Sequence, residues 1–276
     1  MTKLRLLSFI AGVNLVSWGT LLAFSGVSDR SPALIGTAIS LIAFSPLVSA
    51  ALLRLLNRES WENAGLKLRL QEQKAWYGFG VGFPILVIGS ILLLSILLGT
   101  GSVTYTSSTL ISGLKLAGIT FVPMFIASIG EEFGWRGYLE PNLKLQSPSL
   151  VVNHLIVGAV WGVWHLPILL LNESDTSLFE LLMVFIGCLA LGVIYGQVRH
   201  RSGSVWPCVL LHACSNSFTI GAGTSNLLEV EQSYKAIVSL SSNSIATVGV
   251  WIVIAAVFLV IMRKRQDGAE AISAGG

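Results

Sequence analysis

The sequence predicts an all-α fold, a polytopic membrane bundle of about eight transmembrane helices. Of its 276 residues, 53% are hydrophobic and only 11% are charged, whereas ordinary globular domains carry about 25% charged residues. A transmembrane helix needs about 20 mostly apolar residues, and runs of this kind cover most of the chain. The connections between them are short, so we expect residues 1–276 to form a single integral membrane domain.

Eight apolar runs are the candidate spans. The first follows Lys3 and Arg5, as the core of a secretory signal would. Its apolar stretch is too long for such a signal, so we keep it as a span. In chain order the runs cover residues 6–26, 33–56, 77–98, 109–139, 151–171, 178–198, 204–222 and 244–262.

Basic residues predict the orientation of this bundle in the cell membrane, because cytoplasmic connections are enriched in Lys and Arg. With a cytoplasmic N-terminus, 14 of the 17 Lys and Arg residues fall on the cytoplasmic side. The opposite connections carry acidic residues, among them Asp29, Glu173 and Asp175. We therefore expect both termini in the cytoplasm. The net charge of +3 then reflects anchoring at the lipid bilayer and not a nucleic-acid surface.

The stretch from Glu131 to Arg136 places two carboxylates and a guanidinium near the end of the fourth predicted span. Ionisable groups inside a membrane are costly and face a protein interior or a water-filled cavity. Glu132 and Arg136 are four residues apart and can form an ion pair on one helix face. Glu131 points about 100° away and can act as a general base. Alternatively, the three charges merely mark the cytoplasmic boundary.

Two further spans carry polar side chains at comparable depth. His165 lies in the fifth span on the same face as Trp161, and His212 and Asn216 share a face of the seventh. Such an imidazole and carboxamide suit hydrogen-bond donation to one oxygen. Taken alone, each could be a packing residue or an interhelical hydrogen bond. Together with Glu131, they predict an active site inside the membrane.

Small residues indicate how these helices approach one another. The pairs Gly158 and Gly162, and Gly192 and Gly196, have the four-residue spacing that permits close helix packing. We expect them to bring the fifth span against the fourth. His154 lies near the start of the fifth span, and we expect it at the membrane interface.

Several intramembrane chemistries are excluded. The three aspartates, Asp29, Asp175 and Asp267, fall outside the predicted spans, so an aspartyl dyad is not available. The sequence contains no H-E-x-x-H motif of a zinc protease and no G-x-S-x-G motif of a serine hydrolase. A site made of Glu, two His and Asn remains.

These motifs resemble those of the CAAX protease and bacteriocin-processing family, which includes the Ras-converting CAAX endoprotease. That family carries Glu-Glu-x-x-x-Arg, Phe-x-x-x-His and His-x-x-x-Asn or Asp on separate helices of an eight-helix bundle. The resemblance covers about residues 118–220, the expected catalytic core. It departs from the family in one aromatic residue, where Trp replaces Phe. The corresponding stretches here are Glu131-Glu132-x-x-x-Arg136, Trp161-x-x-x-His165 and His212-x-x-x-Asn216.

The resemblance implies an intramembrane endopeptidase that processes a membrane-associated protein or peptide, in CAAX-type or bacteriocin-related processing. Glu131 with His165 would activate a water molecule, and His212 with Asn216 would stabilise the oxyanion. We expect these side chains in one cavity open towards the cytoplasmic half. The reason is that Glu131 sits about 12 Å, at 1.5 Å per residue, from the end of the span near Leu139.

The resemblance also implies that Glu132 and Arg136 orient the site, and it leaves the cofactor open. Members of the family are often described as metalloproteases. Zinc bound by Glu131, His165 and His212, with a fourth position open, is one mechanism. A metal-independent glutamate protease is the other.

Two other classes of membrane protein remain as alternatives. The first is a non-proteolytic member of the same scaffold that acts in bacteriocin immunity or protein interaction, against which the intact motifs argue. The second is a small proton-coupled transporter that relays protons through buried Glu and His. Few helices beyond the three motif helices carry intramembrane charge, and no inverted repeat is visible, which argues against a transporter.

Overall fold

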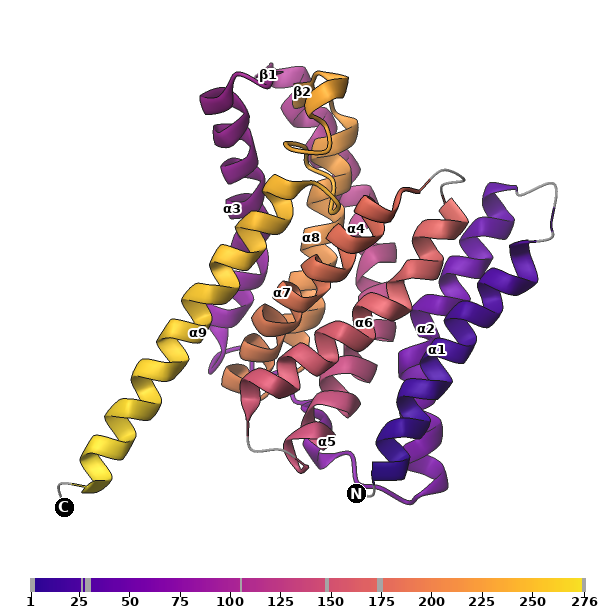
Figure 1. Cartoon of the computed structure of the whole chain (residues 1–276), viewed down its shortest axis with the longest axis vertical. Helices are drawn as coiled ribbons and strands as arrows, with labels where there is room; N and C mark the ends of the chain where they lie inside the picture. The colour runs from indigo at the N-terminus through magenta and orange to yellow at the C-terminus, as the bar shows by residue number, and fades with distance from the viewer. Residues whose placement is uncertain are drawn as a thin grey trace.

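The structure is a polytopic helical membrane bundle, as predicted (Figure 1). It is a computed structural model. Among the described residues, seven helices are long and apolar enough to cross a membrane. The acidic residues Asp29, Glu173 and Asp175, used above for the orientation, lie outside the described part. That part comprises residues 3–25, 27, 31–104, 106–146, 149–172 and 176–274.

Each predicted span corresponds to a long helix. The helices are α1 (Lys3–Ser25), α2 (Pro32–Leu56), α3 (Lys74–Leu98), α4 (Ser107–Gly134), α5 (Glu140–Lys144), α6 (Leu150–Asn172), α7 (Leu178–Ser202), α8 (Trp206–Thr224) and α9 (Ile245–Ala274). Between α4 and α5 lies a π-helical turn, η2 (Trp135–Leu139). The short 3₁₀ helices are η1 (Glu62–Ala64) and η3 (Gln232–Tyr234).

A small antiparallel sheet joins two connections at the top of Figure 1. Strands β1 (Gly101–Val103) and β2 (Leu228–Val230) pair with Ser102 opposite Glu229. The sheet ties the α3–α4 connection to the α8–α9 connection. The hydrophobic periodicity of the spans gave no sign of these two short strands.

Local signals explain where the site helices begin and end. Thr106 and Thr109 form a capping box at the start of α4, and Ser177 and Glu180 form another at the start of α7. Such boxes satisfy two orphan backbone N–H groups reciprocally. Gly203 ends α7 with φ +63°, a conformation that favours glycine. The chain can therefore turn sharply from α7 into α8.

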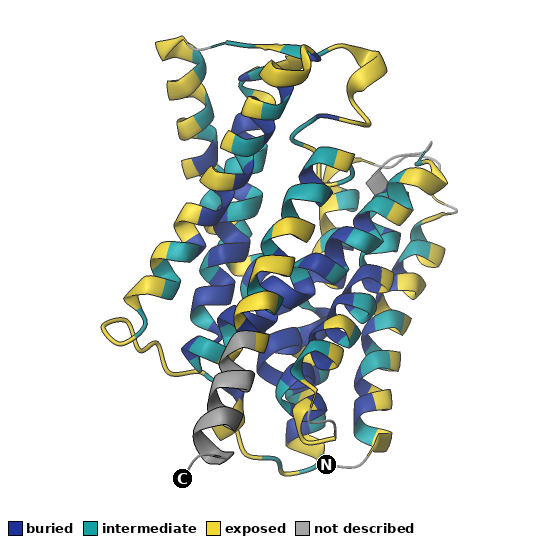
Figure 2. Ribbon diagram, turned by 60° about the vertical axis from the view of Figure 1, so that its left-hand side comes forward, coloured by how far each residue is buried: buried dark blue, intermediate teal, exposed yellow. Residues whose placement is uncertain are grey.

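Helix α8 lies largely inside the bundle, and only its last two residues, Gly223 and Thr224, are exposed. It packs mainly against α3 and α4, and much of it is buried (Figure 2). It is absent from the set of apolar spanning helices found in the described residues. A helix that does not face hydrocarbon can carry polar groups such as His212 and Asn216 at lower cost.

The small-residue pairs bring α6 against α7. A Cβ atom added at Gly158 would lie 2.6 Å from the carbonyl oxygen of Cys188, and one at Gly192 would lie 2.8 Å from the Cα of Gly158. The prediction that these glycines pack the fifth span against the fourth is therefore wrong. Helix α4 instead approaches α2, where a Cβ at Gly130 would meet the carbonyl oxygen of Ala43 at 2.7 Å.

The basic connections lie together at the end of the bundle that carries both termini (Figure 1). Arg5 forms an ion pair with Glu59 of the α2–α3 connection at 2.9 Å. Arg199, near the end of α7, donates a hydrogen bond to the carbonyl oxygen of Asn63 at 2.8 Å. The charged segments thus share one end of the molecule. That this end faces the cytoplasm stays a prediction.

Reporter fusions test this orientation. Fusions at Gly101 and Ser233, at the end of the small sheet, should report a non-cytoplasmic location, because that end lacks the cluster of basic residues. Fusions at Glu72 and Gly203 should report the cytoplasm. At each site, a fusion to alkaline phosphatase reports a non-cytoplasmic location and a fusion to green fluorescent protein reports a cytoplasmic one. A cytoplasmic signal at Gly101 would contradict the orientation.

Candidate active site

A buried ion-pair network joins the end of α4 to α8. The carboxylate oxygen Oε1 of Glu132 accepts a hydrogen bond from Arg136 Nη1 at 3.1 Å. The same oxygen lies 2.9 Å from His212 Nδ1. Glu132 and Arg136 are both 0% exposed. The predicted pair between these two residues is therefore present, and it also fixes the imidazole of His212.

Glu131 points to a different partner, as its position on the helix requires. Its Oε2 atom accepts a hydrogen bond from the indole Nε1 of Trp161 at 2.8 Å. Its Oε1 atom lies 4.0 Å from His212 Nε2. Only 7% of Glu131 is exposed. The two ring nitrogens of His212 thus face the two neighbouring glutamates.

Two aromatic rings enclose the guanidinium of Arg136. Its Cζ atom lies 4.6 Å from the ring centre of Trp161 and 4.7 Å from that of Tyr195. A desolvated cation over an aromatic face gains favourable cation–π energy. Sequence reasoning missed Tyr195, because a lone tyrosine in an apolar helix has no distinctive spacing.

His165 lies one turn along α6 from Trp161. Its Nδ1 atom is 3.3 Å from the backbone carbonyl oxygen of Trp161. The His165 ring also meets the Trp161 ring edge to face, with centroids 5.4 Å apart. These contacts orient His165, while the ring remains half-buried.

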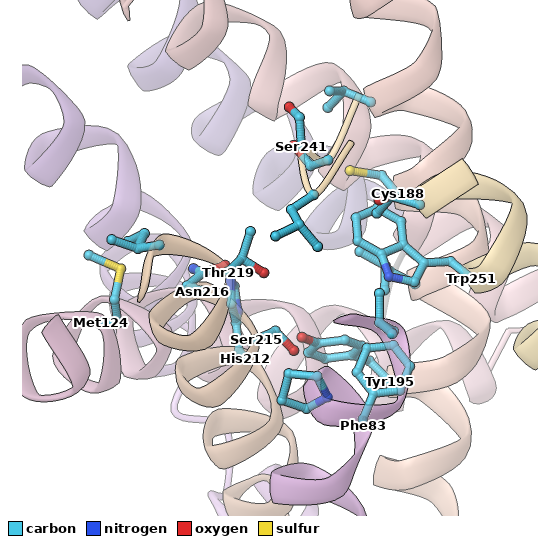
Figure 3. A pocket seen from close by; sticks show the side chains of 18 of the residues that line it. Phe83, Met124, Cys188, Tyr195, His212, Ser215, Asn216, Thr219, Ser241 and Trp251 are labelled. Carbon is cyan, nitrogen blue, oxygen red and sulfur yellow. The ribbon is translucent and has the colours of Figure 1, made fainter. Parts of the chain in front are cut away.

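A cavity of about 450 Å³ brings four of the predicted site residues together, and Figure 3 views it from close by. Glu131, His165, His212 and Asn216 all line it. In Figure 3, His212 and Asn216 project from one helix. Glu132 and Arg136, in contrast, are fully buried behind the lining side chains. Three helices, α4, α6 and α8, therefore bring these four residues to one cavity.

The cavity extends away from the end that carries the termini. Its wall continues to Leu240 and Ser241, in the α8–α9 connection, and to Thr247 at the start of α9. At the other end, all five residues of η2, from Trp135 to Leu139, are buried. That the cavity opens towards the cytoplasmic half stays a prediction, as the orientation of the bundle does.

The π-helical turn was not predicted, and arginines from other helices hold it. Turns of this kind are rare and often occur at functional sites. The carbonyl oxygen of Gly137 accepts a hydrogen bond from Arg54 Nη2 at 2.9 Å. The carbonyl oxygen of Arg136 accepts one from Arg199 Nε at 3.0 Å. Side-chain donors thus satisfy carbonyls at the distorted turn.

A second polar cluster lies outside the cavity. His154, expected at the membrane interface, is 0% exposed and lies inside the protein. Its Nδ1 atom is 3.0 Å from Glu140 Oε1, and its Nε2 atom is 2.8 Å from Gln197 Nε2. The cluster joins α5, α6 and α7.

A zinc ion would require the donor atoms of the site to lie close together. Tetrahedral zinc with bonds of about 2.0–2.1 Å holds its ligand atoms roughly 3.3 Å apart. Glu131 Oε1 and His212 Nε2 are 4.0 Å apart. Within the described part of the chain, no three His, Cys, Asp or Glu side chains are grouped to hold a metal ion. The residues as arranged do not fit a three-ligand centre.

Comparison with known proteins assigns the segment that carries these motifs. A family model for type II CAAX prenyl endopeptidases, Rce1-like, matches residues 113–218. This segment of the chain, which holds all three motifs, is similar to the Rce1-like CAAX proteases. CAAX prenyl protease 2 of Methanococcus maripaludis is 31% identical to the chain over 119 residues, which are 40% of this chain and 44% of that relative. The chain thus spans less than half of the length of this curated relative.

Replacing Glu132 tests how strongly the buried network holds the fold. Glu132→Ala leaves Arg136 as an uncompensated buried charge, which typically costs about 3–5 kcal/mol of stability. We expect a clearly lower unfolding midpoint in detergent. Glu72→Ala is the control, because the Glu72 side chain is 69% exposed and lies 3.9 Å from Arg69; its midpoint should barely change. Equal midpoints for the two variants would contradict a structural role for the network.

Proposed function

We propose that this protein is an intramembrane endopeptidase that hydrolyses a peptide bond in the cavity lined by Glu131 and His212. The supporting observation is the convergence of Glu131, His165, His212 and Asn216 on one cavity of about 450 Å³. The Rce1-like match over residues 113–218 contains all four. Seven helices in the described residues are long and apolar enough to cross a membrane, which supports a multi-pass membrane protein.

In this proposal Glu131 is the general base. Its Oε2 atom is held by Trp161 at 2.8 Å, so Oε1 is the oxygen available on the side of His212. The 4.0 Å between Glu131 Oε1 and His212 Nε2 is too long for a direct hydrogen bond. One water molecule can bridge such a gap. Glu131, with His165 on the same cavity wall, takes a proton from this water as it attacks the peptide carbonyl.

His212 and Asn216 stabilise the oxyanion that follows. The Nδ1–H of His212 donates to Glu132, so Nε2 faces the cavity. Protonated on both nitrogens, His212 donates from Nε2, and the charges of Glu131, Glu132, Arg136 and His212 then sum to zero. The Asn216 carboxamide, four residues along α8, offers a second donor. Each such donor is worth about 3–4 kcal/mol in the transition state.

The same geometry supports a mechanism without a metal. The donor atoms do not fit a three-ligand zinc centre, and no step above is routed through one. Glu132 and Arg136 do not touch the substrate in this mechanism. They orient His212 through the Glu132 carboxylate.

The proposed substrate is a membrane-associated protein or peptide. The name of the Methanococcus maripaludis relative, CAAX prenyl protease 2, makes a prenylated C-terminal CAAX peptide the first substrate to assay. The cavity lining favours a substrate whose bound segment is uncharged. Apart from Glu131, the lining residues are His165, His212 and uncharged side chains. A non-prenylated peptide of the same sequence and an unrelated membrane peptide complete the panel.

Substitutions in the cavity test the proposed roles. Glu131→Gln and His165→Ala should abolish peptide cleavage while the protein stays folded, because each removes a group that activates water. Asn216→Ala should lower kcat by about 10²–10³ and leave residual activity, as when one oxyanion donor is lost. Purified protein in detergent and a mass-spectrometric cleavage assay measure both.

Glu72→Gln, an exposed substitution far from the cavity, should cleave at the unmodified rate. Full activity of Glu131→Gln would refute the proposed peptidase mechanism. If no peptide is cleaved by the unmodified protein, a non-proteolytic membrane role becomes the better explanation.

Metal removal separates the two protease mechanisms. A membrane-permeable chelator should leave the rate within about twofold, because water activation here needs only protein groups. Metal analysis of the purified protein should find no stoichiometric zinc. Loss of activity with the chelator, restored by zinc, would instead support ligation by Glu131, His165 and His212.

A further inference from the structure

Trp161 is the residue at which this chain departs from the motif that it otherwise resembles, which has Phe at this position. The substitution keeps an aromatic ring and adds one polar group, the indole N–H. In the structure this N–H donates a hydrogen bond to Glu131 Oε2 at 2.8 Å. The added N–H group therefore donates its hydrogen bond to the residue that we propose as the general base.

Burial makes this contact strong and exclusive. Trp161 is 3% exposed and Glu131 is 7% exposed. A hydrogen bond to an ionised carboxylate is shorter and stronger than one between neutral groups. Water has little access to replace the indole, so Glu131 Oε2 stays on Trp161.

The contact decides which oxygen of Glu131 is free. With Oε2 held, Oε1 is left facing His212 Nε2 across 4.0 Å. Without the indole donor, the carboxylate can rotate about its last torsion, and its free oxygen is then no longer held towards His212 Nε2. Phenylalanine fills the same wall but cannot donate, so it cannot hold the carboxylate in this orientation.

Trp161 also contacts the second water-activating residue. Its backbone carbonyl oxygen is 3.3 Å from His165 Nδ1, one helical turn away. This contact uses the main chain and survives any substitution of the side chain. The stacking of Arg136 on the ring, at 4.6 Å, needs only an aromatic face. The indole N–H can therefore be removed separately from these other contacts.

We propose that Trp161 is a positioning residue that aims Glu131 for catalysis through its indole N–H. The proposal rests on the proposed peptidase function and adds a role that a phenylalanine cannot fill. Trp161 does not touch the reacting atoms; it acts through Glu131. Its loss should lower the rate of the chemical step and leave substrate binding almost unchanged.

Two substitutions isolate the N–H group. Trp161→Phe removes it together with part of the ring. Replacement of Trp161 by benzothienylalanine, in which sulfur takes the place of the N–H, keeps the size of the ring. Both should lower kcat by about 10- to 100-fold, with KM changed by less than about twofold, because general-base efficiency depends on geometry.

Trp164→Phe is the matched control. Trp164 lies on the same helix, is 0% exposed, and donates its indole N–H to Ser45 Oγ at 3.0 Å. Its substitution also removes a buried indole hydrogen bond, with a similar expected loss of stability, but not one to Glu131. The Trp164 ring also meets the His165 ring edge to face, with centroids 4.9 Å apart, and phenylalanine keeps an aromatic ring there. The kcat of Trp164→Phe should therefore match that of the unmodified protein.

A spectroscopic measurement gives a readout independent of turnover. In ¹⁵N-indole NMR spectra, the peak missing from Trp161→Phe identifies Trp161. Glu131→Ala should move this peak upfield in the proton dimension and leave the Trp164 peak in place. An unmoved Trp161 peak would overturn the proposal.

The outcomes separate this proposal from the function on which it rests. If the unmodified protein cleaves, Glu131→Gln does not, and Trp161→Phe matches the unmodified kcat, then the positioning role is wrong and the peptidase function stands. A higher KM for Trp161→Phe with an unchanged kcat also overturns the proposal. If the unmodified protein cleaves nothing in the panel, both proposals fall.

Discussion

Glu132 is buried with no exposed surface between Arg136 on its own helix and His212 on α8. An ionised carboxylate in a low-dielectric interior is tolerated only when charges and donors surround it. This requirement fixes the distance between the end of α4 and the middle of α8, and it sets the ring orientation of His212. Because Glu131 is adjacent in sequence, its direction is fixed by the same helix. The cavity therefore depends on one buried carboxylate that does not line it.

The sequence predicted what a single helix determines. The spans, the pairing of Glu132 with Arg136 and the shared face of His212 and Asn216 all follow from helical spacing, and the helices are present. Contacts between helices were harder to predict. Gly158 and Gly192 let α6 and α7 pack closely, because the small residues of one helix lie against those of the other. The sequence of either helix alone does not show which helix will be its partner.

Other features escaped prediction for physical reasons of the same kind. The π-helical turn changes the helical register within five residues, and the donors that support it, Arg54 and Arg199, come from distant segments. His154 was expected at the interface because it lies near a helix start, yet Glu140 and Gln197 enclose it. In the sequence, Trp161 was only an aromatic residue in place of Phe, because only the three-dimensional arrangement brings its N–H to Glu131.

The origin of these partners in the chain has a consequence for biosynthesis. Arg136 is made with α4, but His212 and Arg199, which bond to Glu132 and to the turn after it, belong to α8 and α7. During translation, α4 thus emerges with two carboxylates and one guanidinium before half of its partners exist. Helix α4 can pack on α2, which is made before it, but the contact of Glu132 with His212 cannot form until α8 has been synthesised. The polar site is therefore completed late, after much of the N-terminal half can already have packed.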